Sequence, residues 1–183
     1  MKADAALPAG WTRRRWLRAL PGGAAVLSAG AVPTIGAAAI AAPTPAPIDW
    51  PALVAVDGSP LDPAAWQGVP TVVVFWATYC AFCLRHNAHV ERLHRTVDPA
   101  RLRILGVALD RDAAGVRQYL RRHAYGFPVV LDGGQLRQRF TPRRVIPMTC
   151  TLDGDGRLLQ CIPGEMAEDD VMQLGRLALP ALR

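Results

Sequence analysis

Beyond residue 42, this 183-residue sequence has almost no excess charge of either sign. Five of its 21 Lys and Arg residues and one of its 15 Asp and Glu residues lie in the first 42 positions, so the remainder carries a net charge of about +2. Affinity for nucleic acids depends largely on a surplus of basic side chains facing phosphates. The charge therefore argues against a nucleic-acid partner, and the roughly 140 remaining residues suffice for one domain with a real core.

The N-terminal segment has the composition of an export signal. Residues 2–18 are basic, and residues 24–42 form an uncharged run rich in small side chains. Ala39-Ile40-Ala41 matches a cleavage site, so we expect residues 1–42 to be a signal peptide that is removed after Ala41 or Ala42. Residues 43–49 form a proline-rich linker, and residues 50–183 form the folded domain.

The route of export has two candidates. Residues 12–18 read Thr-Arg-Arg-Arg-Trp-Leu-Arg, which resembles the twin-arginine pattern, and an ordinary Sec signal is the alternative. The 19 uncharged residues from 24 to 42 are also just long enough to span a bilayer, so an uncleaved membrane anchor stays open. Either way, we expect the domain to reside in the periplasm.

Cysteine is scarce, with four residues in the chain, and two of the four are only three positions apart. Cys80 and Cys83 directly follow the apolar run 71–76, which is typical of a buried strand, and residues 80–97 have a helical pattern. Helical pitch places residues i and i+3 on one face, and the N-terminus of a helix stabilises an anion. Because such positions lower a cysteine pKa from about 8.5 to about 3.5–7.5, we predict Cys80 as the attacking thiolate and Cys83 as the resolving thiol.

Strand and helix patterns alternate along the rest of the domain. Asp153-Gly154-Asp155-Gly156 is a strong hairpin turn between two further strands. Trp50 and Trp66 are expected to pack an N-terminal β-hairpin onto the core. This order predicts an α/β fold with a mixed sheet that helices cover on both faces. The strands are expected at 53–56, 71–76, 103–109, 127–131, 147–152 and 157–162, and the helices at 80–97, from 112, at 135–140 and at 167–179.

Four short motifs occur in the order found in one known family. They are residues 75–83 (Phe-Trp-Ala-Thr-Tyr-Cys-Ala-Phe-Cys), 146–149 (Ile-Pro-Met-Thr), 152–157 (Leu-Asp-Gly-Asp-Gly-Arg) and 163–165 (Pro-Gly-Glu). Together they resemble the thioredoxin-fold, TlpA/ResA-like group of exported thiol–disulfide oxidoreductases. The resemblance implies a thioredoxin-like sheet with a central strand–helix insertion at 127–140 and a cis bond between Ile146 and Pro147.

The same resemblance implies how the protein works. Tyr79, Ile146 and Pro147 would bind substrate, with an extended segment pairing beside Ile146. The redox-active disulfide would be the only redox group, with no separate cofactor. The partners would be periplasmic protein thiols or disulfides, and a membrane thiol reductase would supply electrons.

Several positions depart from the family pattern. The group usually has Trp-Cys-x-Pro-Cys, whereas Tyr79 and Phe82 stand at the Trp and Pro positions, and His86 replaces a Glu. Cytosolic thioredoxins have a buried Asp where this chain has Val74. Neither Ala81 nor Phe82 offers a charge or a hydrogen bond to a thiolate, so we expect a reductase of protein disulfides rather than an oxidase.

His86 has two interpretations. Its spacing with the apolar residues of the same predicted helix indicates a histidine that packs on the sheet. Alternatively, lying one turn beyond Cys83, it exchanges that residue's proton and tunes the pair.

Two other functional classes have some support in the sequence. One is a copper or zinc binding or transfer protein, whose ligand spacing is resembled by Cys80, Cys83, His86 and His89. However, nine residues of helix advance about 13 Å, so Cys80 and His89 cannot share one centre, and we expect no metal site. The alternative that stays open is a periplasmic copper or zinc carrier that uses the thiolates of Cys80 and Cys83 with one further ligand from a loop or another protein. Peroxiredoxin-like proteins have Thr and Pro where this chain has Ala77 and Val73, which excludes a peroxidase.

The remaining cysteines flank the hairpin turn. If Leu152 pairs with Arg157, Cys150 lies opposite Leu159 and only diagonal to Cys161, so we expect two buried free thiols. A shift of register would place Cys150 directly opposite Cys161 and allow a structural disulfide. Arg143-Arg144, just before Ile146, is expected on the surface, where it would bias the choice of partner by charge.

Overall fold

The computed structural model describes residues 45–179, and the predicted signal segment 1–42 lies outside the described residues. Within this range no helix is both long and apolar enough to cross a membrane. The elements are β1 (Leu53–Val54), β2 (Pro60–Leu61), the 3-10 helix η1 (Pro63–Trp66), β3 (Thr71–Trp76), α1 (Ala81–Thr96), β4 (Arg103–Ala108), α2 (Ala113–His123), β5 (Val129–Leu131), α3 (Leu136–Phe140), β6 (Met148–Leu152), β7 (Leu158–Pro163), α4 (Glu168–Gln173) and the 3-10 helix η2 (Leu174–Ala178).

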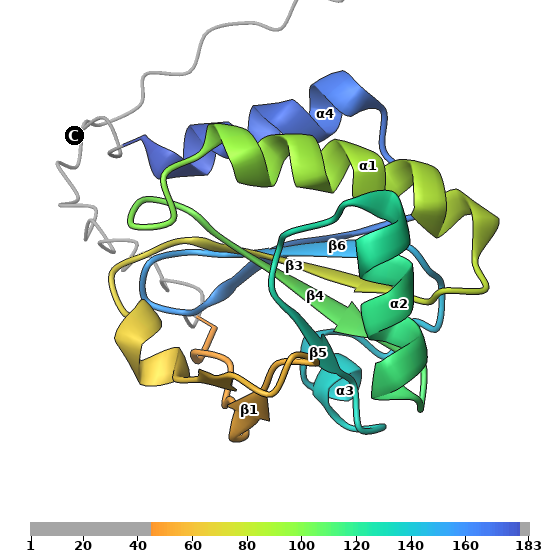
Figure 1. Cartoon of the computed structure of the whole chain (residues 1–183). Helices are drawn as coiled ribbons and strands as arrows, with labels where there is room; N and C mark the ends of the chain where they lie inside the picture. The colour runs from red at the N-terminus through yellow and green to blue at the C-terminus, as the bar shows by residue number, and fades with distance from the viewer. Residues whose placement is uncertain (1–44, 180–183) are drawn as a thin grey trace, which may run out of the picture. The chain divides into compact units, whose positions relative to one another are not determined.

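Five strands form one mixed sheet in the order β5-β4-β3-β6-β7. The strands β3, β4 and β5 run parallel, whereas β6 is antiparallel to β3 and β7 is antiparallel to β6. Figure 1 shows α1 and α4 side by side over one face and α3 with the N-terminal hairpin below the other. The arrangement confirms the predicted α/β fold with a mixed sheet, an N-terminal hairpin extension and a strand–helix insertion, β5–α3.

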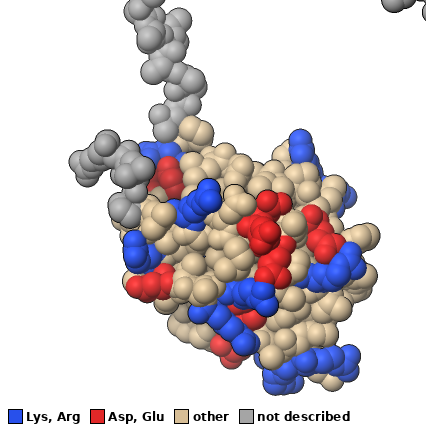
Figure 2. Space-filling model, turned by 90° about the horizontal axis from the view of Figure 1, so that it is seen from above, with Lys and Arg blue, Asp and Glu red and all other residues tan. Residues whose placement is uncertain are grey.

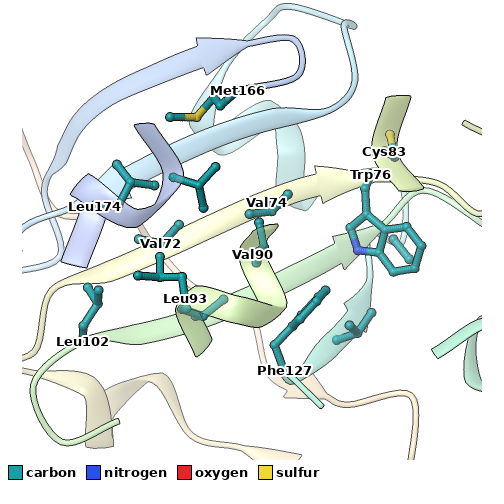
Figure 3. Close-up of a cluster of buried hydrophobic side chains, with 14 of the residues drawn as sticks. Val72, Val74, Trp76, Cys83, Val90, Leu93, Leu102, Phe127, Met166 and Leu174 are labelled. Carbon is teal, nitrogen blue, oxygen red and sulfur yellow. The ribbon is translucent and has the colours of Figure 1, made fainter. Parts of the chain in front are cut away.

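The central strand β3 divides the core into two layers. All six of its residues are buried, and successive side chains point to opposite faces of the sheet. Val72, Val74 and Trp76 share a cluster with residues of α1, α2, α4 and η2. Figure 3 shows the three side chains with Val90 of α1 and Leu174 of η2. Val73 and Phe75 pack with α3 and the N-terminal hairpin. The apolar run that precedes the two cysteines is therefore a fully buried central strand, with core packing on both of its faces.

Trp76 is packed against a glycine of the neighbouring strand. A Cβ atom on Gly106 of β4 would lie 2.8 Å from the Phe127 ring and 3.0 Å from Nε1 of Trp76. Only glycine allows this close approach, because real Cβ contacts are almost never that short. Gly106 thus seats the indole at the end of β3, four residues before Cys80.

The N-terminal hairpin rests on the core through aromatic side chains, as predicted. The Trp50 ring lies 5.4 Å from the Trp66 ring and 5.4 Å from the Phe140 ring, both edge to face. Just before this cluster, the backbone N–H of Ile48 donates to the carbonyl of Gly156 at 2.8 Å. The hairpin therefore covers the face of the sheet opposite α1.

The expectation of free thiols at Cys150 and Cys161 was wrong, because the two residues form a disulfide with a Cα separation of 4.1 Å. An irregularity between Thr151 and Leu152 shifts the register, so Leu152 pairs with Leu158 and Cys150 lies directly opposite Cys161. A β-bulge of this kind changes which residues face each other. The helix expected at 167–179 also differs, since α4 passes into the 3-10 helix η2 at Leu174, a common way for a helix to end.

Candidate active site

Cys80 and Cys83 occupy the first turn of α1. Cys80 is the N-cap of the helix, and its sulfur accepts a hydrogen bond from the backbone N–H of Cys83 at 3.1 Å. The two residues form a disulfide with a Cα separation of 5.2 Å. Cys80 is half-buried, whereas Cys83 is fully buried against Trp76 and Val90. An incoming group therefore meets the sulfur of Cys80 first.

The turn between β3 and α1 is held by Asp110, which sequence reasoning missed. The hydroxyl of Thr78 donates to Oδ1 of Asp110 at 2.5 Å, and the backbone N–H of Thr78 donates to Oδ2 at 3.1 Å. Asp110 follows β4, the parallel neighbour of β3, and the carboxyl ends of parallel strands share one edge of the sheet. A carboxylate that follows a buried strand is the signal in the sequence that could have identified Asp110. This pair of bonds positions the turn that presents Cys80.

The loop before β6 lies at the same edge. Met148 pairs with Phe75 near the end of β3, so Ile146 and Pro147 lie beside the turn that carries Cys80. The bond between Ile146 and Pro147 is cis, and the carbonyl of Pro147 accepts the N–H of Gly164 at 2.8 Å. Within residues 45–179 the backbone of 144–146 makes no hydrogen bond. Its N–H and C=O groups are therefore available to an added strand.

Three large apolar side chains are exposed at this edge. Tyr79 is 76% exposed, Phe82 59% and Val145 50%. Tyr79 and Phe82 flank Cys80 in the chain, and Val145 precedes Ile146. Apolar groups gathered around a reactive sulfur form a surface suited to another protein.

Arg85 contacts both Glu165 and the ring of Phe82. The guanidinium of Arg85 makes two hydrogen bonds to the Glu165 carboxylate, at 2.8 and 2.5 Å, and its Cζ lies 5.2 Å from the centre of the Phe82 ring. Hydrogen bonding to Arg85 lowers the pKa of Glu165, and the same bond raises the pKa of Arg85. Sequence reasoning missed this pair, because its members lie 80 positions apart.

His86 is fully buried and engaged at both ring nitrogens. Nδ1 accepts the backbone N–H of Met166 at 3.2 Å, and Nε2 lies 2.9 Å from the hydroxyl of Thr149. Burial lowers the pKa of His86 to about 4, with a further contribution from the charge of His89. The geometry favours the packing interpretation, since neither nitrogen bonds to Cys83. The proton-transfer hypothesis would require the ring to leave both partners.

Glu91 is a second buried group that the sequence did not reveal. Its Oε2 accepts the backbone N–H groups of Gly126 at 2.7 Å and of Phe127 at 3.2 Å, and its Oε1 accepts from Arg95 at 2.6 Å. The carboxylate thus joins α1 to the segment that enters β5. It supports the helix that carries the cysteines.

The spacing that suggested metal ligands does not produce a ligand cluster in the part of the chain that the structure describes. There, no three His, Cys, Asp or Glu side chains gather as a metal site would require. His89 points elsewhere, with Nδ1 at 3.4 Å from the carbonyl of Met166. The edge of the sheet thus brings together Tyr79, Cys80, Cys83, Ile146 and Pro147, and it leaves His86 and His89 in other contacts.

Comparison with known proteins places this geometry in context. Residues 32–175 match the family model described as Redoxin. Thiol-disulfide oxidoreductase ResA of Halalkalibacterium halodurans is 25% identical over 125 residues, which cover 68% of this chain and 71% of that protein. A thioredoxin-family thiol:disulfide interchange protein from Chlorobium tepidum superposes with a TM-score of 0.68 at 26% identity, covering 76% of this chain and 99% of that one. A secreted Mycobacterium tuberculosis disulfide oxidoreductase, homologous to E. coli DsbE, superposes with a TM-score of 0.60 at 23% identity, covering 69% and 93%.

Proposed function

The chain belongs to the Redoxin family, and on that basis we propose that it is an exported thiol–disulfide oxidoreductase that reduces protein disulfides through Cys80 and Cys83. One observation carries the proposal. A half-buried sulfur caps a helix, accepts the N–H of Cys83, and has a buried second sulfur within bonding reach. That is the arrangement in which one thiol attacks and the other resolves.

The reaction proceeds in two exchanges. In the reduced protein, the Cys80 thiolate attacks one sulfur of a substrate disulfide, which forms a mixed disulfide and releases the other substrate sulfur as a thiolate that takes up a proton. The Cys83 thiol then loses its proton and attacks Cys80, which releases the second substrate thiol and leaves the Cys80–Cys83 disulfide. Two electrons thus pass from the protein to the substrate, and of the two protons that the substrate sulfurs gain, one is lost by Cys83 and one comes from water. The N–H of Cys83 and the helix dipole stabilise the attacking thiolate.

The surroundings of Cys80 support reduction of the substrate as the direction of exchange. Strong oxidants owe their potential to groups that stabilise the reduced thiolate. Ala81 and Phe82 provide no such group, and the positive charge of nearby Arg85 is balanced by Glu165. A modestly stabilised thiolate supports reduction of substrate disulfides.

Substrate would bind across Tyr79, Ile146 and Pro147. The exposed ring of Tyr79 offers an apolar contact on one side of Cys80. On the other side, the free backbone of Ile146 offers hydrogen bonds to an extended segment. Such a segment would bring its disulfide to the exposed side of Cys80.

Export and electron supply complete the proposal. The secreted relative from Mycobacterium tuberculosis supports an exported protein, and the N-terminal sequence supports a periplasmic location. In that oxidising compartment a reductase needs an outside source of electrons, for which we propose a membrane thiol reductase. Cell fractionation with an Arg13→Lys/Arg14→Lys variant tests the route, since loss of periplasmic protein would identify twin-arginine export and unchanged recovery would favour Sec.

The central experiment measures disulfide reduction by the purified, reduced protein. With hydroxyethyl disulfide as a neutral substrate, Cys80→Ala should abolish turnover, and Cys83→Ala should stop at a mixed disulfide that mass spectrometry detects. The matched control, Cys150→Ala/Cys161→Ala, should retain activity because that disulfide lies on the opposite face of the sheet from α1. Turnover by Cys80→Ala, or no reduction by the unaltered protein, would reject the proposal. A reduction potential as oxidising as about −120 mV would reverse the direction.

A further inference from the structure

We propose that Arg143, Arg144 and Val145 form a docking surface for client segments that carry Asp or Glu within a few residues of the cysteine to be reduced. We call these three residues the client-docking loop. The inference rests on the proposed function, because it names the class of protein substrate that the Cys80–Cys83 site prefers.

The client-docking loop is held at both ends by the fold. On one side, the N–H of Arg143 donates to the hydroxyl of Thr141 at 3.2 Å, and Thr141 is buried. On the other side, Ile146 packs against both layers of the core and Pro147 is buried. Between these fixed points Arg143, Arg144 and Val145 are all exposed. The loop therefore presents two guanidinium groups and an apolar side chain from a segment that is anchored at both ends.

Neither guanidinium of the loop has an acidic partner within residues 45–179. Five other arginines of the described residues form ion pairs with carboxylates, and several, such as Arg101 and Arg121, do not; what distinguishes the loop is that two such arginines are adjacent in a stretch, 141–147, that contains no Asp or Glu. The pairs join Arg85 to Glu165, Arg92 to Glu168, Arg95 to Glu91, Arg139 to Asp49 and Arg157 to Asp155. Two adjacent unpaired cations next to the proposed substrate position attract an anionic partner.

The register of the sheet sets the distance between these charges and a bound cysteine. Ile146 lies two residues before Met148, which pairs with Phe75 near the end of β3. A client strand that pairs beside Ile146 advances about 3.3 Å per residue. Client residues two or three positions from the cysteine would then lie opposite Arg144 and Arg143. Carboxylates at those positions meet the guanidiniums, and an apolar neighbour meets Val145.

Other surfaces near the active site do not have this excess of positive charge. A groove of about 400 Å³ beside Thr78 is lined by Asp110, Arg111, Asp112 and Arg122, so its formal charges cancel. On the face over α1 and α4, Figure 2 shows acidic and basic side chains intermixed. The client-docking loop, with two arginines and no carboxylate, instead lies on the β6 side of Cys80, where the backbone of 144–146 is free to pair.

Three peptides of equal length test the inference. Each carries one central cysteine as its mixed disulfide with 2-mercaptoethanol, flanked on both sides by Asp, Asn or Lys, and its reduction by the reduced protein is followed by chromatography. At about 10 mM ionic strength the Asp peptide should react about tenfold faster than the Lys peptide, because charges then act over about 30 Å. At about 1 M salt, where the Debye length is about 3 Å, the three rates should converge.

Arginine variants identify the residues responsible. Arg143→Gln/Arg144→Gln should bring the Asp and Lys peptides to within about threefold of each other. The control is Arg101→Gln/Arg121→Gln, which changes the net charge by the same amount at two exposed arginines. Arg101 precedes β4 and Arg121 lies in the last turn of α2, so this variant should retain the preference for the Asp peptide. Equal rates for all peptides, or an equal effect of both double variants, would overturn the docking surface. Hydroxyethyl disulfide separates the two proposals. If the protein reduces it but shows no preference among the peptides, only the docking surface is rejected. If the protein fails to reduce it, the proposed function is rejected.

Discussion

The backbone N–H of Met166 donates a 3.2 Å hydrogen bond to Nδ1 of His86, and this bond fixes the protonation of a buried imidazole beside the redox pair. Because a backbone N–H can only donate, Nδ1 must be the acceptor, and the single ring proton lies on Nε2, facing the Thr149 hydroxyl. The neutral ring thereby ties α1 to β6 and to the segment before α4. A second ring proton would remove the acceptor that Met166 uses.

Stability should therefore depend on pH through His86. Burial lowers the pKa of His86 to about 4 from the ordinary 6.5. The neutral form is favoured by folding, so its contribution is complete above about pH 6.5 and is lost as the pH falls towards 4. The advantage in unfolding free energy over a His86→Gln variant should shrink by about 3 kcal/mol across that window. Urea unfolding at several pH values measures it, with His94→Gln as the control. A difference that stays constant with pH would contradict this prediction.

The same variant separates packing from proton transfer. If His86 only joins three elements, His86→Gln should leave the titration of the Cys83 thiol unchanged. The measurement is the pH dependence of Cys83 alkylation in a Cys80→Ala background, with and without the substitution. A shifted Cys83 pKa together with slower turnover would restore the proton-transfer hypothesis.

The Cys150–Cys161 disulfide should contribute stability without taking part in exchange. It closes a loop across 11 positions, and removing such a crosslink costs about 3 kcal/mol in the chain-entropy treatment. Cys150→Ala/Cys161→Ala should lower the unfolding free energy by about that amount in urea and leave the reduction of hydroxyethyl disulfide unchanged. A loss of turnover in a variant that remains folded would instead place this disulfide in the reaction.

Glu91 should be more important for stability than an acidic residue on the surface. Glu91→Ala leaves the buried N–H of Phe127 without its acceptor and should cost about 2–3 kcal/mol of unfolding free energy. Glu168, paired with Arg92 on the exposed face, provides the comparison. Glu168→Ala should cost less than about 1 kcal/mol, as exposed ion pairs do. Equal losses in the two variants would show that the Glu91 hydrogen bonds do not stabilise the fold.

Thr78 should act as a positioning residue through Asp110. Thr78→Val removes the hydroxyl that donates to Asp110 at 2.5 Å, and it should cost about 1–2 kcal/mol of stability. Because the turn then holds Cys80 less firmly, the protein should also form mixed disulfides more slowly. Thr78→Ser retains the donor and should restore the rate. A rate in Thr78→Val that equals that of the unaltered protein would confine Thr78 to a structural role.

Most of the fold was predictable, because the main signals are local. The apolar run 71–76 is β3, the helix predicted from residue 112 is α2, with Asp112 as its N-cap, and the turn 153–156 joins β6 to β7. The incorrect prediction concerns strand register, which depends on how residues of two strands pair across the sheet. The bulge between Thr151 and Leu152 shifts the pairing of β7 and changes two expected thiols into a disulfide.

The sequence by itself determined the placement of Cys80 and Cys83, since residues three apart at the start of a helix are neighbours through helical pitch alone. Only the tertiary structure decided what surrounds them. Thr78 and Asp110 lie 32 positions apart, and both Arg85–Glu165 and His86–Met166 lie 80 apart. Such contacts depend on how strands and helices pack and register, whereas the chemistry of the thiol pair depends on a single turn.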